Sequence, residues 1–250
     1  MVRIGGKCLF VAIVVVWVFA CQISFGADTG DSKFTDSHGV KIHYVVQGSG
    51  EPVVLIHGLD SSIRMNWGLP GIIHLLSSRY QVIALDLPGY GESDKPADPN
   101  AYGQAWVEDV IQLMDHVGCR KAHIIGYSMG GMIALKLIVL HPDRVLSGIL
   151  GGMGYMSPDS PFVKIWERMR NPSASGAAQL TLTEAEVKAV KLPVEMIAGS
   201  HDPVRRMYID PLVRLRPDWP VVEVEGAGHL TCIMKDEFKQ ELLKWLDGHR

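Results

Sequence analysis

The chain has 250 residues, and 47% of them are hydrophobic, which suits one globular α/β domain with a sizeable core. Its formal net charge is −3 at pH 7, and no basic block or Lys/Arg-rich helix is visible, so nothing in the sequence points to a nucleic-acid partner. No internal repeat of about 20–50 residues is visible either.

The N-terminus has the pattern of a secretory signal peptide over residues 1–27. A short positive region precedes an uncharged, strongly apolar stretch at 8–20, and small residues follow it. Cleavage is expected after Gly26 or Ala27, which predicts a periplasmic or secreted protein with no stable membrane insertion. Two alternatives stay open. One is a lipoprotein box that ends at Cys21, and the other is an uncleaved anchor, because the apolar stretch approaches the ~20 residues of a spanning helix.

Outside this leader only Cys119 and Cys232 remain. Cys119 precedes a predicted strand, whereas Cys232 follows a histidine that we expect at the opposite end of the sheet. A strand of about six residues spans ~20 Å, and a disulfide tolerates a Cα separation of only about 4.4–6.8 Å. We therefore predict two free thiols.

From residue 28 onward the hydrophobicity pattern predicts strands that alternate with helices. Unbroken apolar runs are typical of fully buried strands, and apolar residues at a spacing of three and four are typical of helices. The expected elements in chain order are strands 33–36, 40–47 and 52–56, helix 70–78, strand 80–85, helix 103–117, strand 121–127, helix 129–140, strand 145–150, a helical insertion at about 154–191, strand 194–198, helix 205–215, strand 221–224 and helix 236–246.

The insertion at 154–191 has room for two short helices. A Ser-Pro pair at 160–161 supplies a capping side chain and a first-turn proline for the first helix. A Thr-x-x-Glu capping box at 183–186 opens the second helix. Between them the stretch 172–178 is small and polar.

Strands alternating with helices imply a mostly parallel sheet covered on both faces, and ligands in such sheets bind beyond the carboxyl ends of the strands. Ser128 stands at such an end, in a Gly-x-Ser-x-Gly motif between strand 121–127 and helix 129–140. This context predicts a sharp, strained turn that lifts the serine clear of the sheet. The backbone N–H of Met129 is then directed at whatever the serine attacks.

A serine hydroxyl is a poor nucleophile at neutral pH, so it needs an adjacent base and an acid that orients the base. The chain offers Asp202 and His229, each shortly after a predicted strand, in an order that suits such a site. The other position for an acid, after the strand that ends near Gly151, holds no carboxylate. His57 and His201 also lie at strand ends, but His57 precedes the serine in the chain and His201 adjoins the acid.

Taken together, these motifs resemble those of the α/β-hydrolase superfamily over about residues 34–246. The resemblance is carried by Leu55-Ile56-His57-Gly58, by the stretch from Asp86 to Ser93, by Gly126 to Gly131, by His141-Pro142, by Gly199 to Asp202 and by Gly226 to His229. It implies an α/β-hydrolase fold over 28–250 and a second oxyanion-hole donor, the backbone N–H of Leu59. The serine at 128 excludes members that carry aspartate there, such as haloalkane dehalogenases and epoxide hydrolases.

The resemblance implies a serine hydrolase that needs no metal or cofactor, and a carboxylic ester is the first expected substrate. A carbon–carbon bond hydrolase, an acyltransferase, a perhydrolase and an amidase stay open as alternatives, as does a small-molecule receptor that retains the same three residues. The insertion is shorter than the cap of many members. Met153, Tyr155, Phe162 and Trp166 are the candidates to line the substrate pocket. The sequence does not indicate the oligomeric state.

Overall fold

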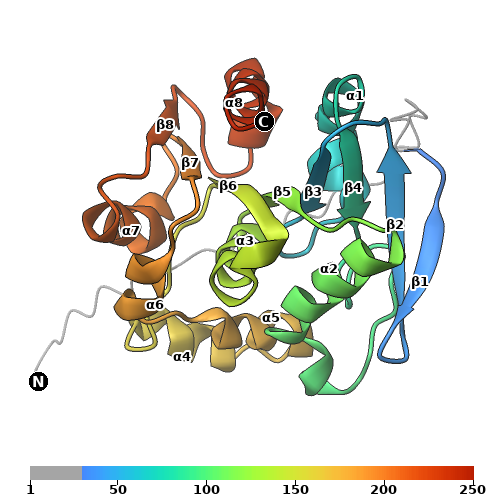
Figure 1. The fold of residues 1–250 in the computed structure, drawn as a ribbon. Helices are drawn as coiled ribbons and strands as arrows, with labels where there is room; N and C mark the ends of the chain where they lie inside the picture. The colour runs from blue at the N-terminus through green and yellow to red at the C-terminus, as the bar shows by residue number, and fades with distance from the viewer. Residues whose placement is uncertain (1–29) are drawn as a thin grey trace, which may run out of the picture.

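A computed structural model describes residues 30–250, which form the expected α/β fold around one eight-stranded sheet (Figure 1). The expected signal peptide at 1–27 lies outside the described residues. The strand order is β1-β2-β4-β3-β5-β6-β7-β8; β2 runs antiparallel to both of its neighbours, and the other five ladders are parallel. The strands are β1 (Lys33–Ser37), β2 (Val40–Gln47), β3 (Pro52–Ile56), β4 (Gln81–Leu85), β5 (Ala122–Tyr127), β6 (Val145–Gly151), β7 (Val194–Gly199) and β8 (Val221–Val224).

The helices agree with the predicted pattern at most positions. They are α1 (Ile72–Ser77), α2 (Ala105–His116), α3 (Met129–Leu140), α4 (Pro161–Glu167), α5 (Pro172–Gly176), α6 (Glu184–Ala189), α7 (Asp210–Leu215) and α8 (Asp236–Asp247). A π-helical turn that was not expected, η1 (Ile63–Gly68), follows β3. A second π-helical turn, η5 (Arg205–Ile209), precedes α7 and lies within the helix expected at 205–215. The helix expected at 205–215 is therefore two consecutive segments with different hydrogen-bond periods.

The unbroken apolar strands are explained by burial of both faces of the sheet. In β3, Val53 and Leu55 belong to the core on one face, whereas Val54 and Ile56 belong to the core on the other. Residues of α1 and α8 complete the first core, and residues of α2, α3 and α7 complete the second. Figure 1 shows these two helical layers on either side of the sheet.

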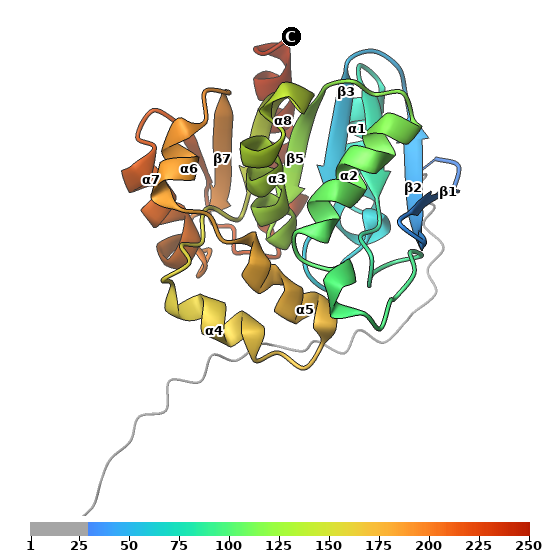
Figure 2. The same cartoon turned by 60° about the horizontal axis from the view of Figure 1, so that its bottom comes forward.

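Three short helices, α4 to α6, occupy the insertion between β6 and β7. Figure 2 shows α4 and α5 lying beyond the end of the sheet toward which the parallel strands point. Ser160 caps α4 and the Thr183–Glu186 capping box opens α6, as predicted. The helix α5 was not predicted, because its residues are small and polar; Asn171 caps it by accepting the Ser173 N–H at 3.1 Å.

The two cysteines of the described chain, Cys119 and Cys232, are free and buried. Among residues 30–250, no helix has both the length and the apolar character that crossing a membrane requires.

β7 carries a buried acid on the face covered by α8. Glu195 is 3% exposed, and Glu241 of α8, which itself pairs with Lys244 at 2.7 Å, lies near it. Burial, and then the negative charge of Glu241, raise the pKa of Glu195 to about 8. The native protein therefore holds this proton more tightly than the unfolded chain does, and the stability associated with it falls as the pH rises from about 4.5 to about 8.

We predict that Glu195→Gln removes part of this pH dependence, because the amide has no charge to bury. The melting temperature of the wild type should therefore fall more than that of the variant when the pH is raised from 5 to 9, and thermal unfolding at both pH values measures this. Glu237→Gln, an exposed acid on α8, is the control. Identical losses of stability in wild type and Glu195→Gln between the two pH values would contradict the assignment.

Candidate active site

The turn between β5 and α3 holds Ser128 in a backbone conformation that residues with side chains rarely adopt. Its φ is 54° and its ψ is −124°, a region associated with strain. A Cβ placed on Gly126 would lie 2.0 Å from the Gly130 carbonyl oxygen, and one on Gly130 would lie 2.1 Å from the Ile56 carbonyl oxygen. Strand, turn and helix therefore approach too closely for a side chain at either glycine. The serine stands partly exposed at the tip of the turn.

Three side chains singled out by the sequence meet at this turn. His229 Nε2 lies 2.9 Å from Ser128 Oγ, and His229 Nδ1 lies 2.8 Å from Asp202 Oδ2. Asp202 follows β7 and is 5% exposed, and its Oδ1 accepts the Val204 N–H at 2.9 Å. A carboxylate only accepts hydrogen bonds, so Nδ1 of His229 carries the ring proton and Nε2 is free to accept the serine hydroxyl. The arrangement can therefore draw the proton from Ser128.

The loop after β3 approaches the same serine from the neighbouring strand. A Cβ placed on Gly58 would lie 3.0 Å from Ser128 Cβ, so the backbone around Gly58 runs directly against the serine. Asn66 of η1 holds this loop by accepting the Gly58 N–H at 2.7 Å. In the described part of the chain, the N–H groups of Leu59 and Met129 donate to no other group. Both remain available for a negatively charged oxygen beside the serine.

His57 supports this loop from within the core. It is fully buried; its Nε2 accepts the Leu87 N–H at 3.0 Å, and its Nδ1 donates to the Gly58 carbonyl oxygen at 2.8 Å. Burial lowers the pKa of His57, which keeps the ring neutral in this role. The side chain of His201, the other histidine beside the site in the sequence, is exposed.

Tyr127, the residue before the serine, makes a contact that sequence reasoning missed. Its hydroxyl donates to the His229 carbonyl oxygen, and its ring centroid lies 5.8 Å from that of His229. The ring also packs edge-on against Phe238 of α8 at 5.7 Å. Gly151 leaves room for it, because a Cβ there would lie 2.7 Å from Tyr127 Cδ2. The strand that carries the serine thus also holds the loop that carries His229.

The four candidates for the substrate pocket take different positions. Met153 is 3% exposed and lies against α3, since a Cβ on Gly131 would lie 3.0 Å from Met153 Cβ. This contact brings Met153 within one helical turn of the serine. Phe162 and Trp166 of α4 are partly buried and pack on Tyr208 of η5; the two rings of Phe162 and Tyr208 are 5.5 Å apart, and Trp166 Nε1 donates to the Tyr208 hydroxyl at 3.3 Å.

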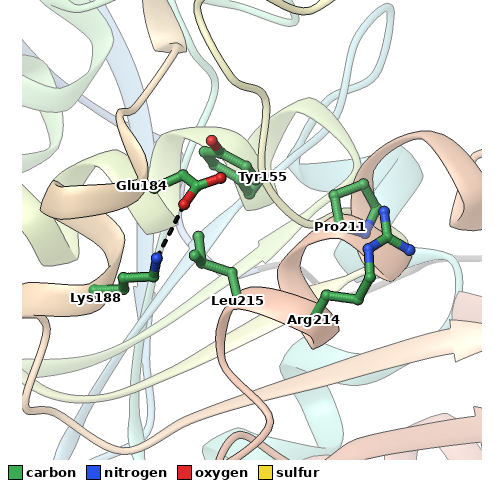
Figure 3. A pocket seen from close by; sticks show the side chains of 6 residues that line it. All are labelled: Tyr155, Glu184, Lys188, Pro211, Arg214 and Leu215. Atoms are coloured by element: carbon green, nitrogen blue, oxygen red, sulfur yellow. Dashed lines mark hydrogen bonds and ion pairs between the residues drawn. The ribbon is translucent and has the colours of Figure 1, made fainter.

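Tyr155 points to a separate cavity of about 250 Å³ between the insertion and α7 (Figure 3). Glu184 and Lys188 of α6, which pair at 2.9 Å, face it from one side. None of the three side chains that meet at the turn lines this cavity. The full lining is Tyr155, Glu184, Lys188, Pro211, Arg214 and Leu215. Among residues 30–250, no group of three or more His, Cys, Asp or Glu side chains is arranged to hold a metal ion.

The family model for the alpha/beta hydrolase fold matches residues 51–180. The chain belongs to the α/β-hydrolase family. Its curated relatives include the dihydrolipoyllysine-residue acetyltransferase component of the acetoin cleaving system of Cupriavidus necator, 32% identical over 74% of this chain and 45% of that protein. They also include a 2-hydroxymuconate semialdehyde hydrolase of Pseudomonas putida, 42% identical over 45% of this chain and 40% of that protein. The chain spans less than half the length of these relatives.

Solved structures of α/β hydrolases align over nearly the whole described chain. A membrane phospholipase A, reported as a bacterial virulence factor, aligns with a TM-score of 0.71 and 26% identity over 90% of this chain and 88% of that one. A carboxylesterase of Bacillus subtilis aligns with a TM-score of 0.70 and 20% identity over 87% of this chain and 92% of that one, which is a likeness of fold alone.

The close approach at the turn gives a direct test of the geometry. We predict that Gly130→Ala lowers the free energy of unfolding by about 3 kcal/mol, because the new Cβ meets the rigid backbone of β3 rather than a side chain that can move. Chemical denaturation measures this. Gly248→Ala is the control, since a Cβ there meets its nearest atom at 3.4 Å. Equal stability of the two variants would show that β3 and α3 are further apart than described.

Proposed function

We propose that this protein is a serine hydrolase that cleaves carboxylic esters through an acyl-enzyme. The observation that carries the proposal is the continuous line from Asp202 through His229 to Ser128 at the strained turn. In this proposal Ser128 is the nucleophile, His229 is the base and later the acid, and Asp202 orients the imidazole and stabilises its cation.

The reaction follows from the positions of the atoms. Ser128 Oγ attacks the ester carbonyl carbon while its proton passes to His229 Nε2. The carbonyl oxygen becomes negative and is held by the N–H groups of Leu59 and Met129. His229 then gives its proton to the departing alcohol oxygen, which leaves an acyl group on the serine. Water repeats the same sequence of steps and releases the acid.

Two features of the fold favour negative charge at this oxygen. Ser128 precedes the first residue of α3, a twelve-residue helix, so the positive end of the helix dipole lies beside the developing charge. The Asn66 side chain occupies the Gly58 N–H, which holds the loop so that the next N–H, that of Leu59, can serve the oxyanion. Donors held in place before the reaction stabilise charge without reorganising during it.

An ester is the favoured substrate because a protein named as a membrane phospholipase A aligns over 90% of this chain and 88% of its own at 26% identity. Structures named as meta-cleavage product hydrolases align over a similar share, 87% of this chain and 98% of theirs, but at 24% identity that likeness is one of fold alone. A carbon–carbon bond hydrolase is the second candidate, on the strength of the 42% identity to the P. putida semialdehyde hydrolase. Acyl transfer is supported by the names of the C. necator relative and of its P. putida counterpart, and this chain matches less than half of each of those proteins. The serine at 128 argues against the chemistry of the epoxide hydrolases among the relatives.

We predict that Ser128→Ala lowers ester turnover by on the order of 10⁴- to 10⁶-fold while the fold survives. The assay is a panel of p-nitrophenyl esters of increasing acyl length, supported by fluorophosphonate labelling of the wild type with the adduct on Ser128 located by peptide mapping. Ser78→Ala, an exposed serine, is the control. Wild-type turnover by Ser128→Ala rules out the assignment. If the wild type is inactive on every ester but cleaves a carbon–carbon bond of a vinylogous diketone, the second candidate, a carbon–carbon bond hydrolase, is selected.

We also predict that Tyr127→Phe lowers kcat about fivefold with little change in KM, because His229 loses a hydrogen bond worth about 1 kcal/mol to its loop. Steady-state kinetics separate the two parameters, and thermal unfolding of the same preparation reports stability. Tyr44→Phe, which loses a hydroxyl next to His116 far from the serine, is the control. An unchanged kcat in a destabilised Tyr127→Phe would make the contact purely structural.

A further inference from the structure

A second serine–histidine–carboxylate line lies toward the edge of the sheet, beside the start of β1, on β2 and beside the end of β4. Ser32 Oγ lies 2.6 Å from His43 Nε2, and His43 Nδ1 lies 2.7 Å from Asp86 Oδ2. Ser32 directly precedes β1, His43 lies in β2, and Asp86 directly follows β4. The order of atoms is the same as in the line that ends at Ser128.

The protonation states follow from the surroundings of Asp86. This side chain is 2% exposed, and it also accepts the N–H groups of Ile63 at 2.7 Å and Glu92 at 2.9 Å. Burial by itself raises the pKa of Asp86, but the hydrogen bonds from His43 and the two backbone donors outweigh it, and the pKa lies below its ordinary value. The carboxylate is therefore ionised and only accepts. Nδ1 of His43 carries the ring proton, and Nε2 accepts the Ser32 hydroxyl.

The histidine is held in place, whereas the serine is open to solvent. His43 is 6% exposed, its backbone N–H donates to Ser93 Oγ at 2.8 Å, and its ring packs against Phe34 at 5.2 Å. The ammonium group of Lys41 lies over the Phe34 ring, 3.8 Å from its centroid, and places a positive charge near His43. Ser32 itself is exposed. A fixed base next to an accessible hydroxyl is the arrangement that activates a serine.

Accessibility distinguishes this line from another serine–histidine pair of the core. Ser147 Oγ lies 2.7 Å from His123 Nδ1 and also accepts the indole N–H of Trp245. Ser147 is fully buried, so no reagent reaches it. Of the two serine–histidine pairs, only the pair of Ser32 and His43 has a serine hydroxyl that a reagent in solvent can reach.

We propose that Ser32 is a second nucleophilic serine, which takes a phosphonyl or acyl group from an activated electrophile. With a fluorophosphonate, Ser32 Oγ attacks phosphorus, an O–P bond forms, the P–F bond breaks and fluoride leaves. The hydroxyl proton passes to His43 Nε2, and Asp86 stabilises the imidazolium. Ser32 leads into a strand, so it lacks the helix N-terminal N–H groups that Ser128 has. One covalent modification is expected, without turnover. The proposal does not depend on ester cleavage at Ser128.

The test uses the full chain with Ser128→Ala, so that the turn serine cannot consume the reagent. The variant is incubated with a fluorophosphonate, and peptides are mapped by mass spectrometry over time. We expect one adduct on Ser32, formed well above the background on the exposed Ser78 of the same sample. Adding Ser32→Ala should abolish it.

Adding His43→Asn instead keeps a donor for Asp86 but removes the base, and should slow labelling of Ser32 by on the order of 10²-fold. Circular dichroism of each variant reports whether it is folded. The proposal is overturned if Ser32 labels no faster than Ser78, or if a folded His43→Asn variant labels Ser32 at the undiminished rate. Labelling of Ser128 in the wild type is a separate measurement, so either assignment can fail alone.

Discussion

The whole site depends on one steric constraint, the contact between three backbones where β5 turns into α3. Gly126 meets the carbonyl of Gly130, and Gly130 meets the carbonyl of Ile56, with no space for a Cβ at either position. This closeness forces Ser128 into its unusual conformation, and it also sets the distance between the serine and the loop after β3. Strain at the serine is thus the cost of bringing the hydroxyl, the helix N-terminus and the Leu59 loop to one point.

The sheet supplies the remaining parts because its parallel strands all end at the same edge. Asp202 and His229 reach the serine from the loops that follow β7 and β8, and the ladders from β5 to β8 hold the ends of these strands side by side. Loops that leave a strand can still move, and Tyr127 limits that motion for His229. Its side chain alternates to the face opposite the helix α3, so one strand positions Ser128 on one side and the His229 loop on the other.

Much of this arrangement could be predicted because it rests on periodic patterns and strand ends. The bounds of α3 were predicted without error, since the helix begins at the turn and ends before Pro142. α5 was missed because five small and polar residues have no apolar period. η1 holds the apolar residues Ile63, Met65 and Trp67, but six residues are too short a stretch to show a helical period. The contact of Tyr127 with His229 depends on which residues face each other across 102 positions of sequence, and no local pattern encodes that pairing.

Comparing the two serine–histidine–carboxylate lines separates activation of a serine from catalysis. Both place a histidine between a buried carboxylate and a hydroxyl at 2.6–2.9 Å. Only the line at Ser128 stands on a tight turn at the start of a helix, beside a loop with an unused N–H. Activation makes the oxygen reactive, but turnover also requires the negative tetrahedral intermediate to be stabilised, and that need is met by backbone geometry. The glycines of the turn, which carry no chemistry of their own, are therefore what distinguishes the proposed catalytic serine, Ser128, from Ser32, for which we propose modification without turnover.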